Sequence, residues 1–411
     1  MLLIDNVNRY FCTMIYCNKL KQHTGLSSEI KSFNAILLSI FVAVLWVGCV
    51  QRPESQGDEK IHVAKFEPFE IKYARGFSVH QSDTSVFVLI HDPSTRQVID
   101  SVNVTGQNPD EVRYFNRLVA QSTTHFAFLQ SLNKLDGLMG LCGIKYLDSL
   151  QKKAIRSTSE ICNAQGIDLE KIVNLNADLV FLYPFGDKDK EQLQRFGIST
   201  LFLTEYLETS PLARAEWLKF FALISGQDPN ATSFEQIENT YLSLIQDKRE
   251  KKHHETIKYR NQGIFNDEKT KPRPNSVAFN LPYGDTWDMP SGNSISATLV
   301  KDAGLNYFLR SKTETGNLLF RLEEAYHHLG ITDYWVIVAE RPKNFSLEDL
   351  KKENRIYSTF PSVRFNKVIF CNTSTTPYFS QGPIEPHILL QDLINCIDGN
   401  DTTNKYFFLL R

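Results

Sequence analysis

The sequence lacks the short motifs that identify the common enzyme classes. It contains no Gly-x-x-x-x-Gly-Lys-Ser/Thr phosphate loop, no Gly-x-Gly-x-x-Gly after a predicted strand, no His-Glu-x-x-His and no Gly-x-Ser-x-Gly nucleophile elbow. These absences argue against the common kinases, dehydrogenases, metalloproteases and hydrolases. We therefore predict that the chain is not an enzyme and has no cofactor or metal ion. The alternative from a different class is an exported α/β hydrolase with a convergent active site.

An excess of charge of one sign is also missing. The 411 residues include 45 Lys and Arg against 47 Asp and Glu, for a formal net charge of −2. A nucleic-acid-binding protein normally carries a basic excess, so we predict no nucleic-acid partner. Aromatic residues are plentiful at 12%. They fit either a Phe-rich core or a cleft for a large, partly apolar ligand.

Cysteine is scarce and dispersed. The seven cysteines include no Cys-x-x-Cys pair, and the later four do not have the spacing of zinc ligands. We interpret these four as packing residues, with one disulfide possible if the chain is exported. They are Cys142, Cys162, Cys371 and Cys396.

One long apolar run is present, at residues 35–47. Its thirteen residues are too few for a membrane span, which needs about 20, but they suit the apolar core of a signal peptide. The following Gly48-Cys49 resembles a bacterial lipoprotein processing site, although Trp46 stands where that pattern prefers Leu. We predict that residues 1–49 are an export signal with Cys49 as the lipidated residue. A plain signal anchor is the alternative.

The remaining chain divides by composition. Short alternating runs at 69–73 and 86–90 predict a small β meander, and from about residue 114 strands alternate with helices, as in parallel α/β sheets. A polar stretch ending in Lys-Pro-Arg-Pro separates two such regions. The predicted domains after the leader are a tether and β meander (50–113), an N-terminal lobe (114–209), connecting helices (210–252), a linker (253–275) and a C-terminal lobe (276–411).

The patterns also place individual elements. Ser210-Pro211 predicts a helix start that continues to Gly226, and Asp228-Pro229 predicts a second helix that continues to about Lys252. Strands are expected at 117–121, 138–142, 178–183, 200–204, 276–281, 334–339 and 367–371. Helices are expected at 125–134, 168–175, 187–196, 294–303, 323–329, 346–352 and 386–397.

A short sequence pattern is repeated in the two predicted lobes. Leu169-Glu170 opens a short helix that leads to a strand starting at Asp178, and Leu322-Glu323 and Asp333 repeat this arrangement. The segments 166–173 and 177–181 resemble the class III substrate-binding proteins of ABC importers, which carry ferric siderophores, haem or cobalamin. The predicted export signal and the long helix predicted to end near Lys252 fit the same family. The segments 210–217, 290–294 and 382–386 are similar to those of Bacteroidetes-type iron-complex lipoproteins.

The resemblance implies an α/β fold with two Rossmann-like lobes joined by a long helix, a ligand cleft between them, and a small β meander in front. It implies a lipid-anchored protein on the periplasmic side of the envelope that captures a ferric siderophore and delivers it to a dimeric ABC permease. Cobalamin and haem are alternative ligands. A surface receptor component without its own permease is another alternative.

The resemblance also implies that Glu170 and Glu323 dock on the permease, one from each lobe. Such paired contacts set register more than affinity. The alternative for each is a solvated Glu favoured by the dipole at a helix N-terminus.

Ligands of open α/β sheets bind at the carboxyl ends of the strands, and this rule selects the candidate contacts. Arg214 could bind an anionic ligand group or pair with Glu205 or Glu216; His125 could ligate haem iron or be structural. For most of the aromatic residues, packing in the core is the alternative. The predicted ligand-binding residues are Thr124, His125, Tyr146, Tyr183, Tyr206, Arg214, Tyr283, Trp287, Asn293 and Phe379.

Overall fold

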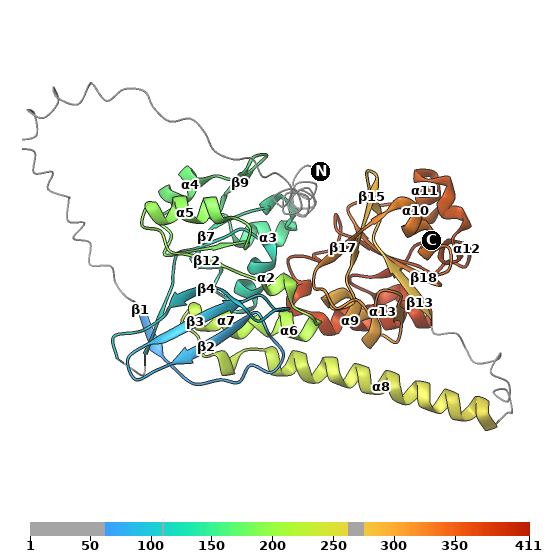
Figure 1. Cartoon of the computed structure of the whole chain (residues 1–411), viewed down its shortest axis with the longest axis horizontal. Helices are drawn as coiled ribbons and strands as arrows, with labels where there is room; N and C mark the ends of the chain where they lie inside the picture. Colours follow the sequence, from blue (N-terminus) through green and yellow to red (C-terminus); the bar gives the residue numbers. More distant parts are fainter. Residues whose placement is uncertain (1–61, 109–110, 262–274) are drawn as a thin grey trace, which may run out of the picture. The chain divides into compact units, whose positions relative to one another are not determined.

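The computed structural model describes residues 62–108, 111–261 and 275–411 (Figure 1). They belong to one compact unit, Ile61–Arg411. The predicted export signal and the lipidated Cys49 lie outside the described residues. In the part of the chain that is described, no helix is both long enough and apolar enough to cross a membrane.

The N-terminal region is built of antiparallel strands. Alternate residues of the central strand, Val86, Val88 and Ile90, are buried, which is the pattern of a sheet with one covered face. This confirms the predicted meander and the strand at 86–90. The three-stranded sheet has the order β2 (Phe77–Gln81), β3 (Val86–His91), β4 (Val98–Asn103), and β1 (His62–Lys65) pairs separately with β5 (Glu111–Tyr114).

The predicted strand at 69–73 is wrong. The backbone N–H groups of Lys72, Tyr73 and Ala74 donate to the carboxylate of Glu216 at 2.7–2.8 Å, so they do not pair with a neighbouring strand. Alternation of apolar and polar side chains mimicked a strand here.

The first lobe is a five-stranded parallel sheet with helices packed around it (Figure 1). Every residue of β11 and β12 is buried, as expected for parallel strands covered on both faces. The sheet order is β12 (Thr200–Phe202), β11 (Leu179–Leu182), β6 (Leu118–Ala120), β7 (Leu138–Leu141), β8 (Ser159–Glu160). The helices are α2 (Thr123–Ser131), α3 (Ser149–Ala154), α4 (Leu169–Asn174) and α5 (Asp187–Arg195), and a small hairpin joins β9 (Cys162–Asn163) to β10 (Gly166–Ile167).

The second lobe repeats this plan with one antiparallel edge strand. Its main sheet has the order β16 (Asn306–Tyr307), β13 (Ser276–Phe279), β18 (Tyr334–Ala339), β19 (Val368–Asn372), β20 (Phe408–Leu409), of which β20 is antiparallel. A second sheet is β14 (Pro282–Tyr283), β15 (Thr286–Pro290), β17 (Asn317–Arg321). The helices are α9 (Ile295–Asp302), α10 (Leu322–Leu329), α11 (Leu347–Glu353), α12 (Pro361–Arg364) and α13 (Pro386–Asp398). The strands and helices predicted from residue 114 onward in both lobes are all present.

Three helices connect the lobes: α6 (Pro211–Ala215), α7 (Trp217–Ile224) and α8 (Phe234–Asn261). Ser210 caps α6 as predicted, with its Oγ accepting from the N–H of Ala213 at 3.1 Å. The structure corrects the predicted boundaries, because the first helix is interrupted at Glu216 and ends at Ile224. The second begins at Phe234, after a 3-10 turn at Pro229–Ala231.

Helix α8 is longer than predicted. It continues past Lys252 to Asn261 and therefore occupies part of the predicted linker. Its first half contacts the N-terminal region, where Glu238 accepts from Tyr73 Oη at 2.7 Å. Farther along, Lys248 pairs with Asp398 at the end of α13 at 2.7 Å. The helix thus joins the two halves of the compact unit (Figure 1).

Two buried carboxylates fasten the N-terminal loop 72–76 to the connecting helices. Glu216 accepts from three backbone N–H groups of the loop and from Lys219 Nζ at 3.0 Å. Glu208 accepts from Arg75 N, Gly76 N and Trp217 Nε1 at 2.8–2.9 Å. Burial raises the pKa of Glu208 to about 7, against the opposing effect of these donors. Both carboxylates therefore have a full set of structural partners.

Replacing Glu216 with Gln tests how much the hydrogen bonds between Glu216 and loop 72–76 stabilise the protein. An amide has only one acceptor oxygen and would direct its own N–H₂ group at backbone donors, so we expect the free energy of unfolding to fall by about 3 kcal/mol. The measurement is urea denaturation followed by circular dichroism. Glu191→Gln on the exposed face of α5 is the matched control, with an expected change below about 0.5 kcal/mol. If both substitutions change the free energy of unfolding equally, Glu216 does not stabilise the protein through loop 72–76.

Candidate ligand-binding site

The loops after β6 and β12 bring two predicted residues to one carboxylate. Thr124 Oγ1 donates to Glu205 Oε1 at 2.8 Å. His125 Nε2 lies 3.2 Å from the same oxygen, close enough for an ion pair but not aligned as a hydrogen bond. The side chains of His125 and Glu205 are completely buried. Two of the predicted contacts therefore meet Glu205 at the carboxyl edge of the sheet.

Glu205 carries a buried negative charge. Burial raises the pKa of its carboxyl, but the His125 charge and the contacts with His125 and Thr124 lower it more, so the pKa lies below its ordinary value. The His125 ring packs against Phe181 and Phe221. Its burial and its pairing with Glu205 favour the structural alternative for His125 over haem ligation.

Two of the predicted tyrosines lie side by side at the same edge. The ring centroids of Tyr183 and Tyr206 are 5.4 Å apart at an interplanar angle of 89°, and Tyr183 also stacks on Phe185. Burial raises the pKa of Tyr183 to about 12 and raises that of Tyr206 as well. Both phenols stay neutral at physiological pH and keep an O–H group.

Arg214 on α6 is a largely buried cation. No carboxylate of the described residues lies within ion-pair distance of it, and its Nε is buried without a partner. Burial lowers the pKa of its guanidinium, and the nearby Tyr378 and Glu205 oppose that shift. Of the alternatives from sequence, pairing with Glu216 is excluded by the loop contacts of Glu216, and no ion pair with Glu205 forms.

The second lobe reaches this edge through the loop after β19. Ser380 Oγ donates to Gln151 Oε1 of α3 at 3.1 Å, and both side chains are buried. Tyr378 of the same loop lies near Arg214, and burial raises its pKa to about 12. Phe379, a predicted contact, is 42% exposed beside them. Residues of both lobes therefore meet around Arg214 and Gln151.

Tyr146 lies on a turn that is fixed from two sides. Gly143 has φ +83°, and a Cβ there would meet the Tyr146 ring at 3.1 Å and Thr123 at 3.5 Å, so the tyrosine lies beside the start of α2. Glu160 accepts from the N–H groups of Gly143 and Ile144 at 2.9–3.0 Å. The Tyr146 hydroxyl is buried without a partner.

A disulfide holds the start of this turn. Cys142 at the end of β7 is bonded to Cys162 of β9. The interpretation of these two cysteines as packing residues is therefore wrong, whereas the open possibility of one disulfide is confirmed. Cys371 and Cys396 are free and buried, which confirms the packing interpretation for them.

Buried polar atoms without a partner are concentrated at this edge. In the described residues they include His125 Nδ1, Tyr146 Oη, Gln151 Nε2, Glu205 Oε2 and Arg214 Nε. An unpartnered buried polar group costs about 1–3 kcal/mol, so a protein rarely keeps several together without a use for them. We call Thr124, His125, Tyr146, Gln151, Glu205 and Arg214 the edge cluster.

The structure does not bring the other predicted contacts to the edge cluster. Trp287 is fully buried, donates from Nε1 to the carbonyl of Phe279 at 2.9 Å and packs on Trp335, so it is a core residue. Its placement argues against direct contact with a ligand. Tyr283 is 47% exposed on β14, and Asn293 Nδ2 donates to the carbonyl of Thr313.

The proposed docking glutamates occupy matching positions in the two lobes. Glu170 lies in the first turn of α4 and Glu323 in the first turn of α10, and both are exposed. Asp168 caps α4 by accepting from the N–H of Lys171 at 3.0 Å. Both carboxylates stand where a helix N-terminus favours negative charge.

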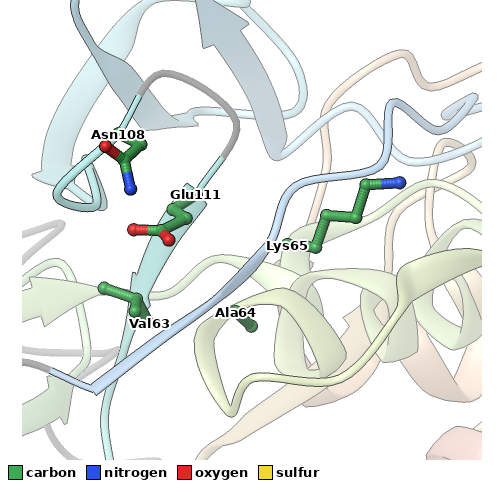
Figure 2. Close-up of a pocket in the computed structure, with 5 residues that line it drawn as sticks. All are labelled: Val63, Ala64, Lys65, Asn108 and Glu111. Carbon is green, nitrogen blue, oxygen red and sulfur yellow. The ribbon is translucent and has the colours of Figure 1, made fainter.

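A hollow of about 530 Å³ lies elsewhere, beside the β1–β5 ribbon. Figure 2 shows that its two charged residues do not converge, because Lys65 extends away from Glu111. Lys65 also pairs with Glu67. None of the predicted site residues lines this hollow. The hollow has fewer polar side chains that could bind a ligand than the edge cluster has, so we retain the edge cluster as the candidate site.

No protein-family model matches the chain. In sequence it is similar to two uncharacterized lipoproteins of Methanocaldococcus jannaschii. The chain is 29% identical to one of them over 93% of its own length and 100% of that protein. It is 25% identical to the other over 71% of its own length and 68% of that protein.

Among solved structures, the chain is similar to Helicobacter pylori CeuE with Ni(II) bound, at 13% identity and a TM-score of 0.52, over 71% of this chain and 87% of that one. It is also similar to an ABC-type Fe³⁺-hydroxamate transport system protein of Saccharomonospora viridis, at 16% identity and a TM-score of 0.51, over 72% and 96%. The chain shares the two-lobed α/β fold of these two structures, which confirms the fold class predicted from its sequence.

Proposed function

We propose that the chain is the substrate-binding protein of an ABC importer and holds its ligand at the edge cluster. The observation that carries this proposal is the concentration of unpartnered buried polar atoms where the loops of both lobes meet. The carboxyl edge of an open α/β sheet is where such folds bind ligands. A ligand with several oxygen atoms would supply partners for Arg214, Tyr146 and Gln151.

The ligand we propose is a ferric siderophore, with cobalamin and haem as alternatives. Arg214 suits a negatively charged oxygen, because hydrogen bonds to charged groups are strong and geometrically specific. The neutral phenols of Tyr183 and Tyr206 add donors and aromatic faces. The solved structures of similar fold are named for Ni(II) and for Fe³⁺-hydroxamate transport, which supports a metal complex as cargo.

We propose no catalytic step for this site. His125 is paired with Glu205, but no hydroxyl or thiol of the described residues is hydrogen-bonded to its ring. A hydrolase of the usual kind needs a nucleophile within hydrogen-bond reach of its base. The two buried free thiols have pKa values raised by burial, so they are poor nucleophiles.

The protein is proposed to work on the periplasmic side of a membrane, attached through the acylated Cys49. The two relatives in sequence are named lipoproteins. The Cys142–Cys162 disulfide fits an oxidising compartment outside the cytoplasm. Two acyl chains would hold the protein at the surface without a membrane span.

Ligand binding is measured on the full chain in detergent, by quenching of tryptophan fluorescence. The probes are ferrichrome, ferric enterobactin, haemin and cyanocobalamin. We expect one of the two ferric siderophores to bind most tightly, and Arg214→Met to weaken that binding by about 10-fold to 100-fold.

Arg195→Met is the matched control, because Arg195 is 78% exposed on α5 and its loss leaves affinity unchanged. If none of the four probes quenches the fluorescence and the chain hydrolyses p-nitrophenyl acetate, the hydrolase alternative replaces the binding protein.

Permease docking is tested by reversing charge on the two lobes. Because Glu170 and Glu323 are exposed on α4 and α10, which carry no residue of the edge cluster, Glu170→Lys with Glu323→Lys should abolish cellular uptake of the bound probe and leave its affinity unchanged. The control pair is Glu191→Lys with Glu348→Lys, also one exposed Glu per lobe. Normal uptake by the double variant refutes docking, and lost affinity assigns these residues to the binding site or the fold.

A further inference from the structure

Gln151 has a side chain fixed by its own helix. It is the third residue of α3, and its Oε1 accepts from the N–H of Asp148 at 3.1 Å while Asp148 Oδ1 accepts from the N–H of Gln151 at 2.8 Å. This reciprocal capping box sets which end of the amide is oxygen, because a backbone N–H can only donate. Unlike a typical capping residue on a surface, Gln151 is only 2% exposed.

The same oxygen holds the second lobe. Ser380 Oγ donates to Gln151 Oε1 at 3.1 Å across 229 residues of sequence, and Ser380 is 3% exposed. The turn that carries Ser380 is itself closed, with Gln381 N donating to the Pro377 carbonyl at 2.9 Å and Gly382 N to the Tyr378 carbonyl at 3.1 Å. The contact therefore joins two well-defined pieces of structure.

The other end of the amide has no partner. Gln151 Nε2 is buried and makes no hydrogen bond, and the Tyr146 hydroxyl on the preceding turn is in the same state. An amide nitrogen offers two hydrogens to acceptors. A ligand oxygen at this place would satisfy the nitrogen without disturbing either bond of the oxygen.

We infer that Gln151 has two separate roles, one in ligand binding and one in the contact between the lobes: Nε2 donates to an oxygen atom of the ligand while Oε1 accepts from Ser380 Oγ. The inference rests on the proposed function and names a contact that the sequence did not indicate. A ligand without an acceptor oxygen here leaves the buried donor unpaired and binds weakly.

The decisive variant is Gln151→Glu in the full chain at pH 8. It replaces only the nitrogen, so the carboxylate still accepts from Asp148 N and Ser380 Oγ but repels a ligand oxygen. We expect affinity for ferrichrome to fall at least 10-fold, with the same loss for any of the other three probes that binds. Hydrogen exchange of segment 377–385 should stay at the wild-type rate. Gln194→Glu on the exposed face of α5 is the control for added charge.

Ser380→Ala separates the two roles in the opposite direction. It removes the hydrogen bond from Ser380 Oγ to Gln151 Oε1 and leaves Gln151 Nε2 in place. Hydrogen exchange of segment 377–385 should therefore accelerate at least 5-fold, while affinity for the probe falls by about 3-fold or less. Wild-type affinity in Gln151→Glu overturns the role of Nε2 as a donor to the ligand. Unchanged hydrogen exchange in Ser380→Ala overturns the role of the Ser380–Gln151 hydrogen bond in holding the second lobe. If the wild-type chain binds none of the probes, the proposed function and the role of Nε2 as a donor to the ligand are both overturned. Hydrogen exchange of segment 377–385 in Ser380→Ala still tests whether the Ser380–Gln151 hydrogen bond holds the second lobe.

Discussion

The parallel sheets of the two lobes decide where polar chemistry can occur in this protein. A parallel strand is covered on both faces, so its side chains must be apolar, as they are throughout β11 and in the buried first four residues of β18. Polar and charged side chains are then left to the ends of the strands and to the loops that follow them. Thr124, His125 and Glu205 stand at such ends, and the loop of Tyr378 and Ser380 follows β19 of the other lobe.

The buried carboxylates of this protein fall into two kinds. Glu216 and Glu208 receive donors on all sides from the loop 72–76 and the connecting helices, so they are complete as structure. Glu205 keeps one oxygen without a partner, and Arg214 keeps Nε without one. Burial alone does not distinguish a structural charge from a functional one, whereas the state of its partners does.

Local pattern was enough to predict most of the fold. Apolar runs bounded by turn residues predicted seven strands of the two five-stranded sheets, but not β8, β16 and β20 or the sheet of β14, β15 and β17. Ser210 before Pro211 predicted the start of α6. The errors arose where a distant residue decided the structure. Residues 69–73 alternate like a strand, but three backbone N–H groups at 72–74 bind Glu216, more than 140 positions away. The Cys142–Cys162 bond was likewise invisible in the spacing alone.

The site was predicted in part, for the same physical reason. The strand-end rule selected Thr124 and His125, and the structure places both beside Glu205, since sheet topology fixes which loops meet. It could not find Gln151, whose capping box with Asp148 gives a complete local reason for a glutamine. It also offered Trp287, whose position after a strand does not reveal that its indole turns into the core.

The central claim is that ligand binds where both lobes meet and not in the hollow beside β1 and β5. Hydrogen exchange of the full chain, with and without the probe that it binds most tightly, tests this directly. Ligand at the edge cluster slows exchange together in segments 122–125, 143–146, 205–207 and 377–385. Slowing confined to segments 62–65 and 111–114, which flank the hollow of Figure 2, would contradict the account.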